Sequence, residues 1–173
     1  MNQETQVALA EVTHKFYFLN DKQSKNEIIL DYLKMQNVRK TIIFGNEQND
    51  RLVSALKQNF TVQTVHSRMN LEQRETVFRD FLDNKTNCFF YLNFNYFNFA
   101  DFERDVDISR IDQLVFFDYE GQEVYFKNIM LCAKAGFQCD VLTLVQSKVE
   151  KGKCKAMLQE IREIAETEVI EDE

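Results

Sequence analysis

Short apolar runs rich in β-branched and aromatic residues alternate along the chain with longer windows whose apolar residues recur at helical spacing. Parallel strands need a crossover connection, usually a helix, so this alternation predicts a parallel sheet with helices on both faces. The expected fold class is therefore α/β, a three-layer parallel sheet. The expected strands lie at 14–19, 41–44, 60–66, 87–92, 113–119 and 139–145, and the expected helices at 21–36, 47–59, from Asn70 onward, 123–134 and 147–167.

Glycine and proline are scarce in this sequence. Only 4 glycines and 0 prolines occur in 173 residues, whereas average usage is about 7% and 5%. Glycine-rich phosphate-binding loops need closely spaced glycines, and Gly45, Gly121, Gly136 and Gly152 stand far apart. The chain alone therefore offers no complete nucleotide-binding loop, and we expect no cofactor in this chain by itself.

The negative charge is concentrated at the C-terminal end. The formal net charge is −7, and residues 159–173 hold seven acidic residues and one arginine, a net −6 that leaves −1 for the rest. This distribution neither supports nor excludes a polyanionic partner for the body of the chain. We expect an N-terminal extension at 1–11, one domain at 12–167 and a solvated acidic tail at 168–173.

Cysteines and histidines do not have the spacing of metal ligands. No C-x-x-C pair occurs, and His14 is remote from His66 in sequence, so we expect no metal site. Cys88 and Cys132 lie in apolar runs, which predicts reduced core cysteines in an intracellular protein of the nucleus or cytoplasm. The sequence lacks a signal pattern and a long apolar run, so we expect no membrane partner.

Four segments follow one another in a characteristic order: IIFGN at 42–46, TVQTVHSRMNLEQRETVFRDF at 61–81, RDVDISRI at 104–111 and QLVFFDY at 113–119. This order resembles the C-terminal RecA-like lobe of the DEAD-box RNA helicases over residues 12–164. Among subfamilies it is most similar to the mRNA-export helicases and to translation initiation factor 4A. The resemblance implies a RecA-like fold that binds single-stranded RNA and completes an ATP site lying mainly on a separate N-terminal lobe.

The resemblance also implies an RNA-binding set of Asn46, His66 and Arg74. Asn46 ends the IIFGN segment, His66 matches the His-Gly turn, and Arg74 matches the arginine of the Gln-x-x-Arg motif. Two neighbours depart from the family pattern. Glu47 stands where serine or threonine is common, and its carboxylate would repel a phosphate, while Leu71 replaces the motif glutamine.

The nucleotide-binding residues implied by the resemblance are Arg104 and Asp107, which match the Arg-Gly-x-Asp motif with Asp105 at its glycine. A carboxylate at Asp107 can accept a hydrogen bond from the ATP ribose. The last family motif, His-Arg-x-Gly-Arg-x-Gly-Arg, aligns with residues 127–134, where no arginine remains. An arginine finger contributes about 10³ to 10⁵ in rate, so we expect no catalytic residue in this chain.

Residues 93–99, NFNYFNF, form the one locally biased stretch. Exposed aromatic faces there would stack on unpaired bases or form a protein-contact patch. The simpler interpretation is that the aromatic residues extend a strand or attach an insertion to the body.

Together these features predict a degenerate DEAD-box C-terminal lobe that acts non-catalytically as an RNA-associated or protein-binding module. The expected partners are single-stranded RNA and an N-terminal RecA-like lobe or another protein, with ATP bound only when such a lobe is present. Two alternatives stay open. One is a lobe of a divergent but active ATP-dependent RNA helicase whose N-terminal lobe is missing from this chain, and the other is a pure protein-interaction domain.

Overall fold

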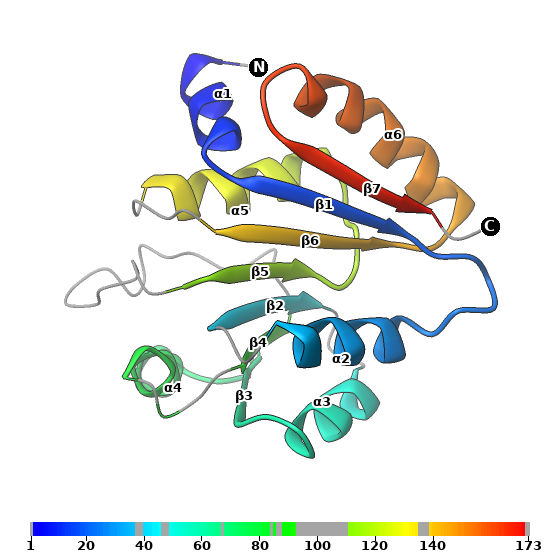
Figure 1. The fold of residues 1–173 in the computed structure, drawn as a ribbon. Helices are drawn as coiled ribbons and strands as arrows, with labels where there is room; N and C mark the ends of the chain where they lie inside the picture. Colours follow the sequence, from blue (N-terminus) through cyan, green and yellow to red (C-terminus); the bar gives the residue numbers. More distant parts are fainter. Residues whose placement is uncertain are drawn as a thin grey trace.

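The structure, a computed structural model, describes residues 2–36, 40–45, 49–66, 68–83, 85, 88–92, 111–134 and 139–171. In this part of the chain seven strands form one sheet with helices on both faces (Figure 1). The strands are β1 (Thr13–Phe18), β2 (Thr41–Gly45), β3 (Val62–Val65), β4 (Cys88–Leu92), β5 (Gln113–Phe116), β6 (Asp140–Val145) and β7 (Thr167–Glu171). The helices are α1 (Gln3–Ala10), α2 (Lys25–Met35), α3 (Asp50–Lys57), α4 (Leu71–Leu82), α5 (Gln122–Lys134) and α6 (Lys148–Arg162).

The strands pair in the order β3-β4-β2-β5-β6-β1-β7, and each pairing between described strands is parallel. The three central strands β2, β5 and β6 are buried almost throughout, as expected of strands covered on both faces. This arrangement confirms the predicted α/β parallel sheet and its RecA-like architecture. Since all strands run the same way, their carboxyl ends meet at one edge of the sheet.

Two apolar clusters form the core, one on each face of the sheet. In β2, Ile42 and Phe44 point to one face and Ile43 to the other, which follows from the two-residue period of a strand. The first face is covered by α1, α4, α5 and α6 and the second by α2 and α3. The helices of the first face contribute buried residues that include Leu9, Phe78, Phe81, Tyr125, Ile129, Met157 and Ile161.

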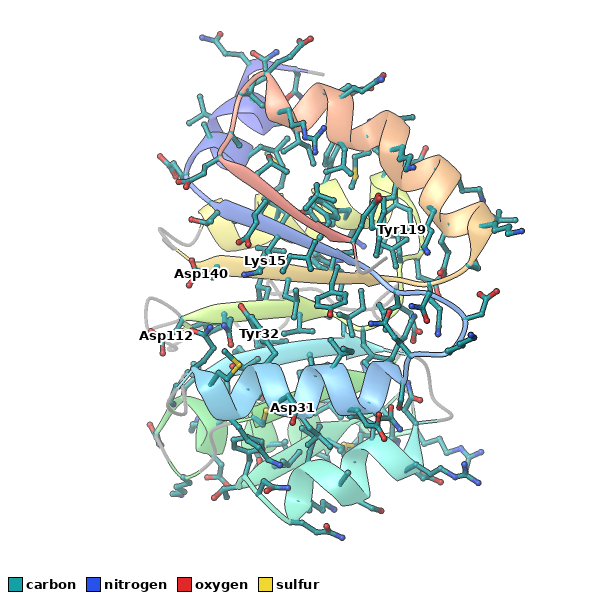
Figure 2. All side chains as sticks on the ribbon, turned by 45° about the vertical axis from the view of Figure 1, so that its right-hand side comes forward. Lys15, Asp31, Tyr32, Asp112, Tyr119 and Asp140 are labelled. Atoms are coloured by element: carbon teal, nitrogen blue, oxygen red, sulfur yellow. The ribbon has the colours of Figure 1, made fainter. Side chains whose placement is uncertain are left out.

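A short chain of hydrogen bonds ties α2 to the sheet. Gln113 is fully buried, and its Nε2 donates to Tyr32 Oη at 3.0 Å, while its Oε1 accepts from Thr41 Oγ1 at 3.1 Å. Figure 2 shows Tyr32 at the end of α2, next to the amino ends of β5 and β6. The buried amide therefore has a partner for each of its ends, as burial of a polar group requires.

The C-terminal part of the chain differs from the sequence-based expectation. The helix predicted over 147–167 ends at Arg162, where a turn closes through Ala165 N–H donating to Ile161 O at 2.9 Å. The segment predicted partly as a solvated tail contains β7, which pairs with β1 at the sheet edge. Its apolar residues Val169 and Ile170 and the ion pair of Lys15 with Glu168, 2.9 Å long, hold it there.

Helix α1 lies within the segment predicted as an extension and packs against α5. A buried histidine joins the two: His14 Nε2 donates to Leu9 O at 2.9 Å, and His14 Nδ1 accepts from Tyr125 Oη at 2.5 Å. These partners fix His14 as the neutral Nε2-protonated tautomer. His14 is fully buried, and desolvation lowers the pKa of its imidazole below the ordinary 6.5.

Cys88 has the environment that the sequence predicted, Cys139 and Cys154 share that environment, and the side chain of Cys132 lies outside the described part of the structure. Cys88, Cys139 and Cys154 are free and buried, and desolvation raises the pKa of each thiol to about 12. They are therefore protonated and inert near neutral pH. Among the described helices, none has the length and apolar content needed to cross a bilayer.

The buried His14 predicts that the free energy of unfolding decreases as the pH falls through about 6.5. Its folded-state pKa is lowered, so below 6.5 the unfolded chain binds more protons than the folded chain, and stability present above that pH is lost. The slope from this one group reaches at most about 1.4 kcal/mol per pH unit.

Urea titration of the wild type and of His14→Gln, at about pH 7.5 and about pH 5.5, measures this effect. The glutamine does not titrate, so the variant should lose less stability between the two pH values. Equal losses in the two proteins would contradict the assignment.

Candidate nucleic-acid interface at the carboxyl edge of the sheet

The turn from β3 to α4 carries two of the predicted RNA-binding residues. His66 follows the last residue of β3, and Arg74 lies in the first turn of α4. Met69 lies between them in the chain. Met69 N–H donates to His66 O at 3.1 Å, and Met69 O accepts from Arg74 Nε at 3.0 Å. The structure therefore brings His66 and Arg74 to one turn, where both are hydrogen-bonded to the backbone of Met69.

The start of α4 is closed by a capping box. Gln73 N–H donates to Asn70 Oδ1 at 2.9 Å, and Asn70 N–H donates to Gln73 Oε1 at 3.0 Å, so the predicted helix start at Asn70 is confirmed. Arg74 N–H donates to Asn70 O. Capping satisfies donors that would otherwise be open to an anion at a helix start. The negative charge of Glu72 in the first turn interacts favourably with the helix dipole, but it would repel a phosphate.

Arg74 is half-buried and stabilises the turn through its bond to Met69 O. His66 is half-buried as well, and its Nδ1 is buried without a hydrogen-bond partner among the described groups. An unsatisfied buried polar atom costs about 1–3 kcal/mol. A hydrogen-bond partner from outside the described residues, such as a ligand, would therefore stabilise this conformation of His66. For this reason His66 stays a candidate site residue.

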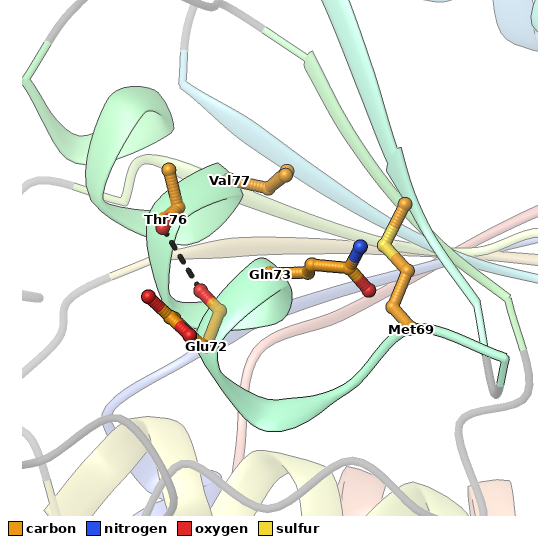
Figure 3. Close-up of a pocket in the computed structure, with 5 residues that line it drawn as sticks. All are labelled: Met69, Glu72, Gln73, Thr76 and Val77. Atoms are coloured by element: carbon orange, nitrogen blue, oxygen red, sulfur yellow. Dashed lines mark hydrogen bonds between the residues drawn. The ribbon is translucent and has the colours of Figure 1, made fainter.

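A shallow depression of about 400 Å³ lies on the outer side of the first turns of α4 (Figure 3). Met69 and Val77 give it an apolar floor that continues into the core, and Glu72, Gln73 and Thr76 form its other walls. Thr76 Oγ1 donates to Glu72 O at 2.9 Å. Among the described residues that line it, the only charged one is the acidic Glu72, and this favours contact with a protein surface over contact with a phosphate.

Helix α5 carries the positions of the family's last motif. Asn128, at the position of the first arginine, is fully buried, and its Nδ2 donates to Val124 O one turn earlier at 2.9 Å. Asn128 Oδ1 has no partner among the described groups. The neighbouring Lys127 is exposed. The Asn128 amide thus points toward the preceding turn of its own helix and lies on the buried side of α5. It is neutral, so it offers no positive charge to a nucleotide.

The middle of the carboxyl edge is held by contacts that the sequence alone did not indicate. Lys25 Nζ donates to Phe117 O at 2.9 Å and lies 3.1 Å from Asp118 Oδ1, with both side chains largely buried. Gln146 Nε2 donates to Asn20 O at 3.2 Å and Gln23 O at 2.9 Å. These residues come from segments far apart in the sequence, so no local pattern marks them.

Of the other predicted site residues, Asn46, Arg104 and Asp107 lie outside the described residues, as does the 93–99 stretch. Their roles therefore stay predictions, as do those of His66 and Arg74. Within the described ranges, no group of three histidine, cysteine or acidic side chains is arranged to hold a metal ion.

The capping box predicts a shared energetic role for Asn70 and Gln73. Asn70→Ala should lower the free energy of unfolding by about 1 kcal/mol, because Gln73 N–H loses its acceptor. Gln73→Ala should cost less, and the double variant should cost less than the sum, since both residues belong to one reciprocal pair. Urea unfolding of the four proteins measures this cycle. Strict additivity would show that the two bonds do not act as a unit.

Comparisons with known proteins agree with this architecture. The C-terminal domain of the DEAD-box protein Dbp5 superposes with a TM-score of 0.73 at 15% identity, covering 94% of this chain and 91% of that one. E. coli SrmB bound to RraA superposes with a TM-score of 0.64 at 17% identity, covering 94% and 91%. S. cerevisiae Dbp5 bound to RNA and ADP BeF3 gives a TM-score of 0.74 at 15% identity, covering 98% of this chain but 44% of that one.

At the level of sequence, a search of curated proteins gave no match. The family model described as the helicase conserved C-terminal domain matches residues 24–130, more than half of the chain. The match begins just before α2 and ends within α5, so it contains the β3–α4 turn and the first part of the last motif. The chain therefore belongs to the helicase conserved C-terminal domain family, with the fold of the C-terminal lobe of DEAD-box proteins.

Proposed function

We propose that this chain is a non-catalytic lobe of the DEAD-box type that works as an RNA-associated or protein-binding module. The observation that carries the proposal is the absence of the motif arginines from α5. Its sequence contains no arginine, and the residue at the first arginine position, Asn128, is buried and bonded to Val124 O within the helix.

The missing arginines bear directly on phosphoryl transfer. The charge that develops on the transferring phosphoryl group is stabilised by a planar, permanently charged guanidinium, worth about 10³ to 10⁵ in rate. At the three arginine positions, Asn128 and Leu131 are neutral and Lys134 is a point charge without bidentate geometry. The changes therefore remove the chemistry of this lobe, while the apolar side of α5 that packs on the sheet is kept.

Nucleotide binding, where an N-terminal lobe is present, would rest on Arg104 and Asp107. RNA binding would rest on Asn46, His66 and Arg74, of which Arg74 supplies the one permanent charge. Support for such partners comes from related folds: S. cerevisiae Dbp5 is known bound to RNA, and its C-terminal domain bound to Gle1 and IP6. E. coli SrmB is known bound to RraA.

ATP turnover is the direct test of the non-catalytic proposal. The chain, mixed with the N-terminal lobe of a DEAD-box protein and single-stranded RNA, should add no turnover to that of the N-terminal lobe alone. RNA-stimulated turnover above this background that Asp107→Ala abolishes would contradict the proposal, because it would require a working nucleotide site in this lobe.

RNA association is tested by fluorescence anisotropy with single-stranded RNA at low salt. The affinity should fall steeply with salt and should be reduced by Arg74→Ala, because a phosphate contact is lost. Arg79→Ala is the matched control, since it removes the same charge from the exposed side of the same helix. Equal effects of the two variants would assign the binding to general charge and not to Arg74.

Two other functions have specific support. A pure protein-interaction domain is favoured by the depression beside Glu72 and by the exposed Leu71, and it predicts no salt-dependent RNA binding. One lobe of a two-lobe protein is favoured by the length of S. cerevisiae Dbp5, of which this chain covers 44%. The intact mass of the endogenous protein distinguishes the latter: a species near 20.6 kDa excludes a two-lobe polypeptide.

A further inference from the structure

The outer side of helix α6 forms an exposed ridge. The opposite side of the helix packs in the core through Cys154, Met157, Leu158 and Ile161. At about 100° per residue, the residues farthest from this buried side are Lys148, Val149, Gly152, Ala156, Gln159 and Glu163. We call these six residues the α6 ridge. Figure 1 shows α6 at the β7 end of the sheet, and all six residues are exposed, so no described helix or strand covers the ridge.

The α6 ridge is basic at its start and acidic at its end. Lys148 is the first residue of the helix, and Glu163 follows the last one with helical backbone angles. The four ridge residues between them are uncharged. One flank repeats this order, because Lys153 precedes Glu160 by seven residues and so lies within about 20° of it around the helix. All four charged side chains are exposed, and none forms an ion pair with a described residue.

A second copy of the chain is the partner whose charges match the α6 ridge. Copies related by a two-fold axis bring the same surface together, so two α6 helices would meet antiparallel. The pair Lys148 and Glu163 is centred between residues 155 and 156, and the pair Lys153 and Glu160 between residues 156 and 157. A single axis at Ala156 therefore places each of the two lysines opposite a glutamate of the other copy.

Small residues at the centre of the α6 ridge would let two helices approach closely. Gly152 and Ala156 are one turn apart, and a Cβ added at Gly152 would meet nothing within 4 Å, so no packing contact within the chain requires a glycine. Glycine is among the least favourable residues for a helix interior. The close approach of another backbone would explain its place. Val149, which is 68% exposed, adds an apolar side chain beside it.

The other flank of α6, beside β7, opposes this arrangement. The same flanks of two antiparallel helices face each other, and Lys151 and Arg162 are also centred between residues 156 and 157, so these like charges would repel across the axis. Glu171 of β7 lies 4.0 Å from Lys155 and offsets part of the charge of this flank. The flank therefore weakens the pairing, and an acidic residue at position 151 should strengthen it.

From this geometry we propose that the chain forms a transient homodimer through the α6 ridge, with the two helices antiparallel about a two-fold axis at Ala156. The antiparallel arrangement sets the positive end of each helix dipole beside the negative end of the other. Six residues a copy are few beside the roughly 20–30 of a standard interface, so the dimer should form only at high protein concentration. The β3–α4 turn belongs to the opposite end of the sheet and stays open in such a dimer.

Sedimentation velocity of the full chain at low salt, over a wide range of protein concentrations, tests the charge pattern. The wild type should show a reversible monomer–dimer equilibrium that weakens with salt, since exposed ion pairs are screened. Lys148→Glu should raise the dissociation constant by about tenfold or more, because like charges then face each other twice. The double variant Lys148→Glu with Glu163→Lys should restore it. Lys151→Glu is the matched control: it makes the same change in net charge one turn away, yet it should lower the dissociation constant, because it faces Arg162 of the other copy.

Gly152→Leu tests the close approach of the two helices. Leucine favours a helix more than glycine does, and its Cβ meets no atom of this chain within 4 Å, so the variant should keep or raise the melting temperature. Its dissociation constant should rise by about tenfold or more, because the helices are held apart. Circular dichroism of each variant verifies the fold.

Three results would overturn the proposal. They are a wild type that stays monomeric at every concentration, a shift in the same direction for Lys148→Glu and Lys151→Glu, and a Gly152→Leu variant that dimerises like the wild type. None of these measurements uses RNA or ATP, so their failure would leave the proposed function to be decided by its own tests.

Discussion

Parallel pairing of all the described strands is the constraint on which the other features depend. Each strand must return by a crossover, so helices cover both faces, and the carboxyl ends of the strands meet the starts of the following helices at one edge. The β3–α4 turn, the Lys25–Asp118 pair and the start of α6 all lie at this edge. The fold therefore gathers there the residues that a ligand would meet, whatever chemistry the chain has kept.

The residues that pack the core and the residues at the family's motif positions have different roles in this structure. Buried apolar residues pack the sheet, and α5 is held by the buried bond between His14 and Tyr125 and by the apolar cluster around it. Positions that serve RNA and nucleotide in the family carry other side chains, such as Leu71 and Asn128. Asn128 Nδ2 donates within its own helix, to Val124 O, while its Oδ1 has no partner among the described groups. The hydrogen bond of Asn128 thus lies within α5, and this is the observation on which the proposed non-catalytic role rests.

Much of the fold was predictable from local signals, because buried strands and amphipathic helices leave periodic patterns and Asn70 with Gln73 marks a helix start. Strand β7 was missed because it is short, half charged and follows a helix directly, and its partner β1 lies at the other end of the chain. The His14–Tyr125 bond joins residues 111 positions apart. No local pattern encodes such a pair, so the site's supporting contacts came only from the structure.

RNA affinity in ATP, compared with the affinity in a non-hydrolysable ATP analogue, is the measurement that bears most directly on a non-catalytic binding module. A lobe that does not support hydrolysis responds to the two nucleotides alike, whereas hydrolysis converts ATP to ADP and removes any affinity that depends on bound ATP. With an N-terminal lobe supplied, the account predicts the same affinity for single-stranded RNA in ATP as in the analogue. An affinity that falls with time toward its value in ADP when ATP is used, but stays constant in the analogue, would contradict it.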